Sequence, residues 1–419
     1  MNTPTRWSAA GIVILLSLGS VWAAEPTINI TNDVAQGALQ NSHRQQIDEY
    51  VAHHVKIMAG AATKDAVVAS RRKLTDSYNR FGSQAQEYTM AFAASLAKHG
   101  EVMLKGVASD DRLASLKKVN LALAASQMGQ VSLSPLAVQM VSHSDASVRF
   151  FGWEAYASMR PAVLATGGKP TETMFAALSD RLAKETDPHV LGQMMRMFVF
   201  RGIDQFGGLV SQEAYDAGVA QFFKVLQANW TNLCRRVLDA DGQTAEAASI
   251  AVETPNRFRA EIKGKVADKD VAQMLANMAW SAGKAFDQSL AIQAAADLAR
   301  KAEQANRLAT REPTEPNLET AKAATAAAAK AATKAKRTVA QLPSVPQSEF
   351  AISTISKLLT DCEAAMNSLT GAGSNFIDGA LKKRSSDPGA DVRMAVFKWV
   401  DALSKKYEIK QPEDIVPAK

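Results

Sequence analysis

The sequence predicts an all-α fold, and three observations support this prediction. Apolar residues recur at helical spacing over long segments, alanine is abundant while aromatic residues make up only 6% of the chain, and no run of alternating β-branched residues is bounded by turn dipeptides. Alanine favours helices, whereas sheets favour β-branched and aromatic residues. The 419 residues are enough for two or three domains or for one continuous helical array.

The clearest helix signal spans residues 211–238. Its apolar residues recur at intervals of three and four over more than five turns, a pattern too long and regular for strands. Ser211 is placed to cap the first turn, and the segment from Asp239 to Gly242 is typical of a helix end. The apolar stripe consists of Tyr215, Val219, Phe222, Phe223, Leu226, Trp230, Leu233 and Val237.

The first residues have the pattern of a secretory signal peptide. Arg6 precedes an apolar stretch from Ala9 to Trp22, and Val21-Trp22-Ala23 offers a cleavage site. The alternative is an uncleaved anchor, although the apolar run is short for a bilayer span. We therefore expect residues 1–23 to be removed from an exported bacterial protein, periplasmic or extracellular, that keeps no membrane span.

A weak repeat marks the starts of several predicted helices. Asp145, Asp187 and Asp268 each stand three residues before a valine, and Asp387 opens a related start near the C-terminus. An aspartate in this position accepts hydrogen bonds from the unpaired N–H groups of a first helical turn, and the valine begins the apolar face. The sequence therefore predicts helices that start with similar chemistry at intervals along the chain.

An arginine follows the valine in two of these starts, at Arg149 and at Arg393. With the hairpin 145–157 and 171–184, this pattern resembles the helical hairpins of HEAT repeats, whose period is about 40–47 residues. Leu191 and Ala272 replace the arginine in the other two starts, so we expect an irregular array. The resemblance implies a stacked superhelix that presents a surface to a protein partner.

The composition changes after Arg311. Residues 312–346 hold four prolines around an Ala/Lys-rich stretch, which is expected to form either a lone exposed helix or a disordered segment. We interpret it as a semi-rigid linker. The predicted organisation is a signal peptide (1–23), an N-terminal helical region (24–129), a HEAT-like array (130–311), the linker (312–346) and a C-terminal helical unit (347–419).

The C-terminal unit is expected to contain three helices. Ser348 is predicted to cap the first of them and Gly371 to end it, because glycine accommodates the left-handed conformation at a helix C-terminus. A second helix is expected over residues 375–383, and the last one follows Asp387-Pro388.

The basic charge of the chain is concentrated in one tract. The formal net charge is +6, and the segment 322–337 contains five cations and no acid. This tract either contacts a polyanion, such as an anionic envelope component, or keeps an alanine helix hydrated. It has no aromatic residue on which bases could stack, which disfavours nucleic acid. The cations are Lys322, Lys330, Lys334, Lys336 and Arg337.

Motifs for catalysis or for metal binding are weak. His53 lies one turn after Glu49, but no third ligand recurs nearby. Two Ser-x-x-Lys matches, Ser70–Lys73 and Ser115–Lys118, lack the companion motifs of a penicillin-binding enzyme. The segment Gly371-Ala-Gly373-Ser374 is typical of a helix end rather than of a nucleotide site. We therefore expect no catalytic, cofactor or metal site.

Two further groups have alternative interpretations. A cluster of methionines near residue 195 could line an adaptable binding groove, but its spacing favours a place in the core. Cys234 and Cys362 could form a disulfide after export or remain buried as small apolar side chains. The methionine cluster consists of Met194, Met195 and Met197, with Phe198 and Phe200 beside them.

The function expected from these features is that of a non-catalytic interaction or scaffold protein of the bacterial cell envelope, with another protein as partner. The alternative is attachment to a polyanion or envelope surface through residues 322–337. A third hypothesis is an enzyme whose site is assembled from distant residues, which sequence motifs do not reveal.

Overall fold

The prediction of an all-α fold is confirmed. A computed structural model is 81% helical, and no β-strand occurs in the residues that it describes. None of the helices in this part of the chain is long and apolar enough to cross a membrane. The predicted signal peptide, Phe200 and residues 239–241 lie outside the described residues. The structure describes residues 25–82, 84–199, 203–206, 208–238, 242–243, 245–247, 249–250, 266–371 and 373–412.

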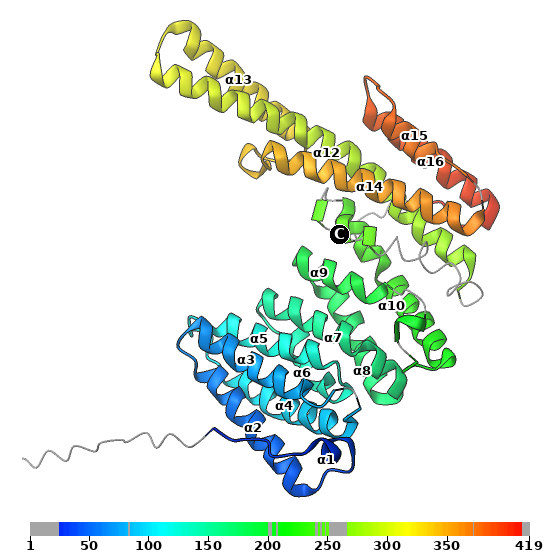
Figure 1. Ribbon diagram of the computed structural model, residues 1–419. Helices are drawn as coiled ribbons and strands as arrows, with labels where there is room; N and C mark the ends of the chain where they lie inside the picture. Colours follow the sequence, from blue (N-terminus) through cyan, green and yellow to red (C-terminus); the bar gives the residue numbers. More distant parts are fainter. Residues whose placement is uncertain are drawn as a thin grey trace, which may run out of the picture.

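The first half of the chain is a stack of helices in two layers (Figure 1). In one layer α2, α4, α6, α8 and α10 follow one another, and in the other layer lie α3, α5, α7 and α9; neighbours within a layer and hairpin partners across the layers are in contact. The elements are α1 (Asn32–Gln36), α2 (Asn41–Gly60), α3 (Lys64–Asn79), α4 (Gln86–Gly106), α5 (Ala114–Met128), η1 (Val131–Leu133), α6 (Ser134–Val141), α7 (Ala146–Thr166), α8 (Gly168–Lys184), α9 (Pro188–Met195), η2 (Arg196–Phe198), η3 (Ile203–Phe206) and α10 (Gln212–Leu238).

The second half is organised around one long helix, α12 (Asp268–Arg311). At 44 residues it is about 66 Å long, since each residue adds about 1.5 Å. Its first part contacts α10, α14 and α16, and its second part forms an antiparallel hairpin with α13 that projects from the molecule (Figure 1). The remaining elements are α13 (Glu315–Lys334), η4 (Val339–Gln341), α14 (Val345–Thr370), α15 (Phe376–Lys382) and α16 (Pro388–Tyr407).

One apolar core joins the two halves. A single cluster of buried side chains runs from Ile28 near the N-terminus to Ile409 near the C-terminus. The indole N–H of Trp230 on α10 donates to the backbone carbonyl of Met274 on α12. A small separate cluster of Ile292, Ala295 and Ala335 lies at the base of the projecting hairpin. The helical stack and the C-terminal helices therefore bury apolar surface against each other.

Most of the predicted helix starts are observed. Asp145, Asp187 and Asp387 accept hydrogen bonds from the first turns of α7, α9 and α16. Ser211 accepts one from the backbone N–H of Ala214, as predicted. Asp268 differs, because α12 begins at that residue and its N-cap is Ala267. The Asp268 side chain thus lies in the first turn. Its negative charge interacts favourably with the helix dipole there, but it does not cap the helix by a hydrogen bond.

The predicted start of the first helix of the C-terminal unit is wrong by four residues. Helix α14 begins at Val345, and Ser344 and Gln347 form a reciprocal capping box. Pro346 is accommodated because the first helical turn needs no N–H donor there. Ser348 is a buried residue inside the helix. The other end agrees with the prediction, since Gly371 adopts φ 69° directly after α14.

The Ala/Lys-rich segment is not the isolated helix that its composition indicated. Helix α13 packs along α12 and buries Ala321, Ala328 and Ala332. Methyl side chains remove little surface from water individually, but they allow two helix axes to approach closely. The flanking prolines lie at the ends of α13 and α14 and do not separate the segment from the rest. The division of the chain into domains stays a prediction.

Candidate interaction surfaces

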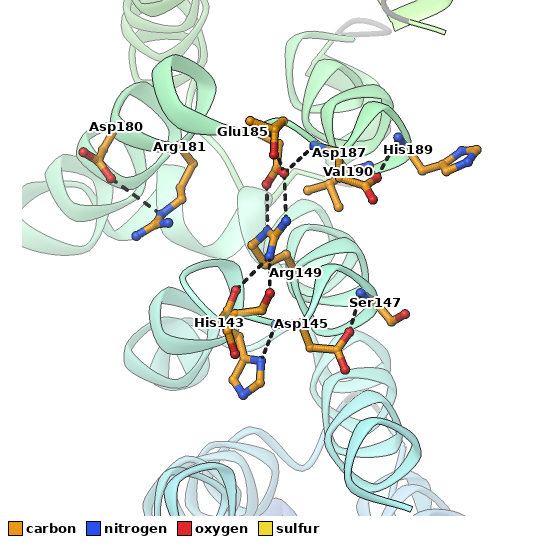
Figure 2. Close-up of polar contacts among 12 residues, drawn as sticks. His143, Asp145, Ser147, Arg149, Asp180, Arg181, Glu185, Asp187, His189 and Val190 are labelled. Carbon is orange, nitrogen blue, oxygen red and sulfur yellow. Dashed lines mark hydrogen bonds and ion pairs between the residues drawn. The ribbon is translucent and has the colours of Figure 1, made fainter. Parts of the chain in front are cut away.

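A line of polar contacts, half-buried at Arg149 and buried at Glu185, connects the turns of the helical stack (Figure 2). Arg149 on α7 donates from Nε and from one terminal nitrogen to the two carboxylate oxygens of Glu185, at 2.8 and 2.9 Å. Its other terminal nitrogen donates to the backbone carbonyls of His143 and Ser144, at 3.0 and 2.8 Å. One side chain thus holds the α6–α7 turn and the α8–α9 turn together.

The carboxylate of Glu185 is almost completely enclosed, with its side chain 2% exposed. Besides Arg149 it accepts from the backbone N–H groups of Thr186 and Asp187. Burial alone raises the pKa of Glu185, but the hydrogen bonds from Arg149 and from the Asp187 backbone outweigh burial and hold this pKa below its usual value. Glu185 is therefore a buried anion with donors from both sides.

The same line continues toward the N-terminus through the α6–α7 turn. The Ser115 hydroxyl on α5 donates to the carboxylate of Asp145. The ring of His143 accepts from the Asp145 backbone N–H at Nδ1, and its Nε2 lies 3.1 Å from Nζ of Lys118. Burial, followed by the neighbouring Lys118, lowers the pKa of His143. Helices α5, α7 and α9 are thereby joined by successive polar contacts.

The contacts of Ser115 and Lys118 show how one of the two Ser-x-x-Lys matches is arranged. These two residues have different partners, and Ser115 is bonded to a carboxylate rather than to an amine. In the other Ser-x-x-Lys match, Ser70 donates to the backbone carbonyl of Ala66 and Lys73 pairs with Glu25. Neither match brings its serine and lysine together as a nucleophile and base.

A groove of about 480 Å³ lies between α2 and the C-terminal part of α4. Its walls are apolar, while His99, Lys56 and Asp111 stand among them. The His99 ring is held by Asp48, whose Oδ1 lies 3.0 Å from Nε2. Val102 is 69% exposed on this surface. The other lining residues are Ala52, Val55, Ala59, Met103, Gly106, Val107 and Ala108.

A second groove, of about 690 Å³, runs along the projecting hairpin. Among its lining residues, Asn306 on α12 donates from Nδ2 to the Thr325 hydroxyl on α13 at 3.2 Å. Ion-paired Glu303 and Arg307 stand among its walls. The other lining residues are Ala299, Ala302, Thr310, Arg311, Ala328 and Val339.

The predicted polyanion tract lies on this hairpin. Lys322, Lys330 and Lys334 are exposed on α13, and Lys336 follows in a left-handed conformation with φ 55°. These four lysines form no ion pair within the described part of the chain, whereas the backbone N–H of Arg337 donates to Ala332 at the helix end. The structure thus presents most of the tract to solvent.

Glu49 and His53 contact different neighbours in the structure. Glu49 accepts a hydrogen bond from Gln45, and the His53 ring contacts the ring of His54 edge-on. Among the described residues, no group of three or more His, Cys, Asp or Glu side chains could hold a metal ion. His54 is buried and pairs with Glu25, with 3.2 Å between Nε2 and Oε1.

The methionine cluster and the cysteines belong to the core. Met194, Met195, Met197 and Phe198 are buried, which agrees with the core interpretation. Cys234 and Cys362 are free thiols, also buried. Burial raises the pKa of Cys234 to about 12 and raises that of Cys362 as well. Both thiols are therefore held in their unreactive protonated form.

One buried acid was missed by the sequence analysis. Glu363 on α14 is 3% exposed, and its carboxylate accepts from the backbone N–H groups of Ile377 and Asp378, at the start of α15. The Ser374 hydroxyl also donates to it. The Gly371–Ser374 segment is thus a connection between two helices, and Glu363 caps the second helix from a distance of 14 residues in sequence.

Comparisons with known proteins identify no family. No family model matches the sequence, and no curated protein matches it. Among solved structures, the crystal structure of an engineered protein is similar at 12% identity, with 88% of this chain and 93% of that chain covered and a TM-score of 0.23. A TM-score this low does not indicate a shared architecture.

Proposed function

We propose that this chain is a non-catalytic scaffold of the bacterial cell envelope, exported to the periplasm or beyond, whose HEAT-like helical stack binds a protein partner. The two-layer order of α2 to α10 supports this proposal. Aspartate caps open α7 and α9, and Arg149 joins the turns before these two helices, which resembles the helical hairpins of HEAT repeats. Stacks of this kind present a continuous surface to partners.

The observation that carries the proposal is the apolar groove between α2 and α4. It is open to solvent, its walls are preformed by packed helices, and Val102 is 69% exposed there. A contiguous apolar surface that stays exposed on a folded protein is typical of a site that binds a partner. His99, Lys56 and Asp111 could orient that partner by hydrogen bonds at the groove.

The test uses two substitutions on the same helix. Val102→Glu places a charge in the groove, and Met90→Glu places the same charge on α4 outside it, at a residue that is 56% exposed. A partner captured from the native envelope fraction by the wild type should be retained by Met90→Glu and lost by Val102→Glu. Equal capture by both variants would contradict a role for the groove.

A second candidate function is attachment to an anionic surface through the hairpin. It is favoured by the four lysines that have no ion pair within the described part of the chain. Phosphate-rich surfaces bind such clusters with a strong dependence on salt. Replacing Lys330 and Lys334 by glutamine should then weaken binding to phosphatidylglycerol vesicles at low salt. The matched control replaces Lys269 and Lys398, and equal binding by all proteins would exclude this function.

A further inference from the structure

Helix α13 has one face that contacts α12 and an opposite face whose residues are exposed in the described part of the chain. Ala321, Ala328 and Ala332 form the contact face. The opposite face follows the spacing i, i+4, i+8, i+11, i+15 and i+19, so its side chains lie along one side of the helix. It consists of Glu315, Glu319, Ala323, Ala326, Lys330 and Lys334, all exposed.

The charges on this outer face are sorted by sign. Two acids occupy the end at the hairpin tip, two lysines occupy the end at the base, and only alanine lies between them. Acids near the N-terminus of α13 and lysines near its C-terminus interact favourably with the dipole of this helix and so stabilise it. The helix dipole therefore accounts for the order of the signs.

The helix dipole does not account for the spacing within each pair. Glu315 and Glu319 are four residues apart, and so are Lys330 and Lys334, so that each side chain stands one turn from a like charge. Like charges at this spacing destabilise a helix. None of these four residues has an ion pair within the described residues. Opposite charges from another molecule would relieve both repulsions.

A second copy of the same helix provides those charges in register. If two α13 helices run antiparallel, Glu315 faces Lys334 of the other copy while Glu319 faces Lys330. Both pairs form in one register, because residues 315 and 334 are centred on the same point of the helix as residues 319 and 330. Twofold symmetry repeats each pair, as an isologous interface requires. The alanines at the centre allow close approach of the two helices.

We propose that this protein forms a homodimer through the outer face of α13, with the two projecting hairpins antiparallel. The hairpin extends away from the helical stack (Figure 1), and the residues of its outer face are exposed. The interface depends on exposed ion pairs and on small apolar side chains, so the dimer is weak and sensitive to salt. This dimer is independent of the proposed partner groove, which lies on α2 and α4.

The test exchanges charges on the outer face. Glu315→Lys with Glu319→Lys makes the face entirely basic, and Lys330→Glu with Lys334→Glu makes it entirely acidic. In sedimentation equilibrium at low salt, the dissociation constant of the wild-type dimer should rise about tenfold or more in each double variant, because every pair becomes repulsive. An equimolar mixture of the two variants should form heterodimers, since each then faces its opposite charge.

A control separates this effect from net charge. Lys269→Glu with Lys398→Glu alters the net charge of the chain as much as the acidic variant does but leaves α13 intact, and it should dimerise as the wild type does. Circular dichroism should show unchanged helix content in all variants, and thermal unfolding should shift only slightly in the two α13 variants, whose exchanged charges oppose the helix dipole. A monomeric wild type at all concentrations, or a mixture of the double variants that does not associate, would overturn the proposal.

Discussion

The guanidinium of Arg149 is paired through two nearly equal hydrogen bonds with the carboxylate of Glu185, which lies 36 residues away at the next turn of the stack (Figure 2). Two parallel bonds fix the orientation of both groups more strongly than one bond would. Because Arg149 also holds two backbone carbonyls of its own turn, this pair determines how successive helical hairpins are placed relative to each other.

Removing Arg149 should therefore destabilise the whole stack. Arg149→Leu leaves the Glu185 carboxylate buried without its cation, and we expect a loss of about 3–5 kcal/mol in the free energy of unfolding. The measurement is urea unfolding followed by circular dichroism. Lys184→Ala serves as the control, because Lys184 pairs with Asp180 on the exposed surface and its loss should cost at most about 1 kcal/mol. Equal effects would show that the buried pair is not important for stability.

Acidification should destabilise the protein through two histidines. Burial lowers the pKa of His54, against the opposing charge of Glu25, and burial together with Lys118 lowers that of His143. The unfolded chain then takes up protons at a higher pH than the folded chain. The free energy of unfolding therefore falls as the pH drops below about 6.5, by up to about 1.4 kcal/mol per pH unit for each histidine.

The pH effect can be assigned by substitution. In the double variant His54→Gln and His143→Asn, stability should change little between about pH 7 and pH 5.5, because ordinary carboxyl groups titrate below this range. The other charged groups near the two rings are Lys73, His53, Asp145 and Arg149. A pH dependence equal to that of the wild type would show that groups other than these two histidines are responsible.

Two glycines in neighbouring helices should respond in opposite ways to alanine. A Cβ atom at Gly152 in α7 would lie 2.8 Å from Cβ of Met140 and 3.0 Å from the backbone of α6, so the two helices would have to separate. We expect Gly152→Ala to cost about 1–3 kcal/mol. A Cβ at Gly192 in α9 meets nothing within 4 Å, so Gly192→Ala should stabilise by up to about 1 kcal/mol. Thermal unfolding of both variants tests the α6–α7 packing.

Local signals predicted the parts of the fold that depend on neighbours in sequence. Apolar periodicity located α10, and side-chain caps located the starts of α7, α9 and α16, because both depend on residues within a few turns. The start of α14 was missed although Ser344 and Gln347 have the spacing of a capping box. That signal was available and would have corrected the predicted boundary.

Contacts between distant residues could not be predicted in the same way. Arg149 was noticed in the sequence, but nothing near it identifies Glu185 as its partner. The alanines of α13 pack against α12 only after the chain has folded back on itself. In a helix made mostly of alanine, the buried and exposed faces differ little in hydrophobicity, so the sequence does not show which face is buried. Glu363 likewise caps a helix that it precedes by 14 residues. The grooves are built from such contacts, so no motif revealed them.

The state of Cys234 and Cys362 gives a direct test of the core. Both thiols are free and buried in the structure, so we expect a thiol reagent at neutral pH to modify neither residue in the native protein. After unfolding without a reductant, two thiols per chain should react. Reaction in the native state would show that the core around α10 and α14 opens readily. If no thiol appeared after unfolding until a reductant was added, the two cysteines would be joined by a disulfide, which export would permit.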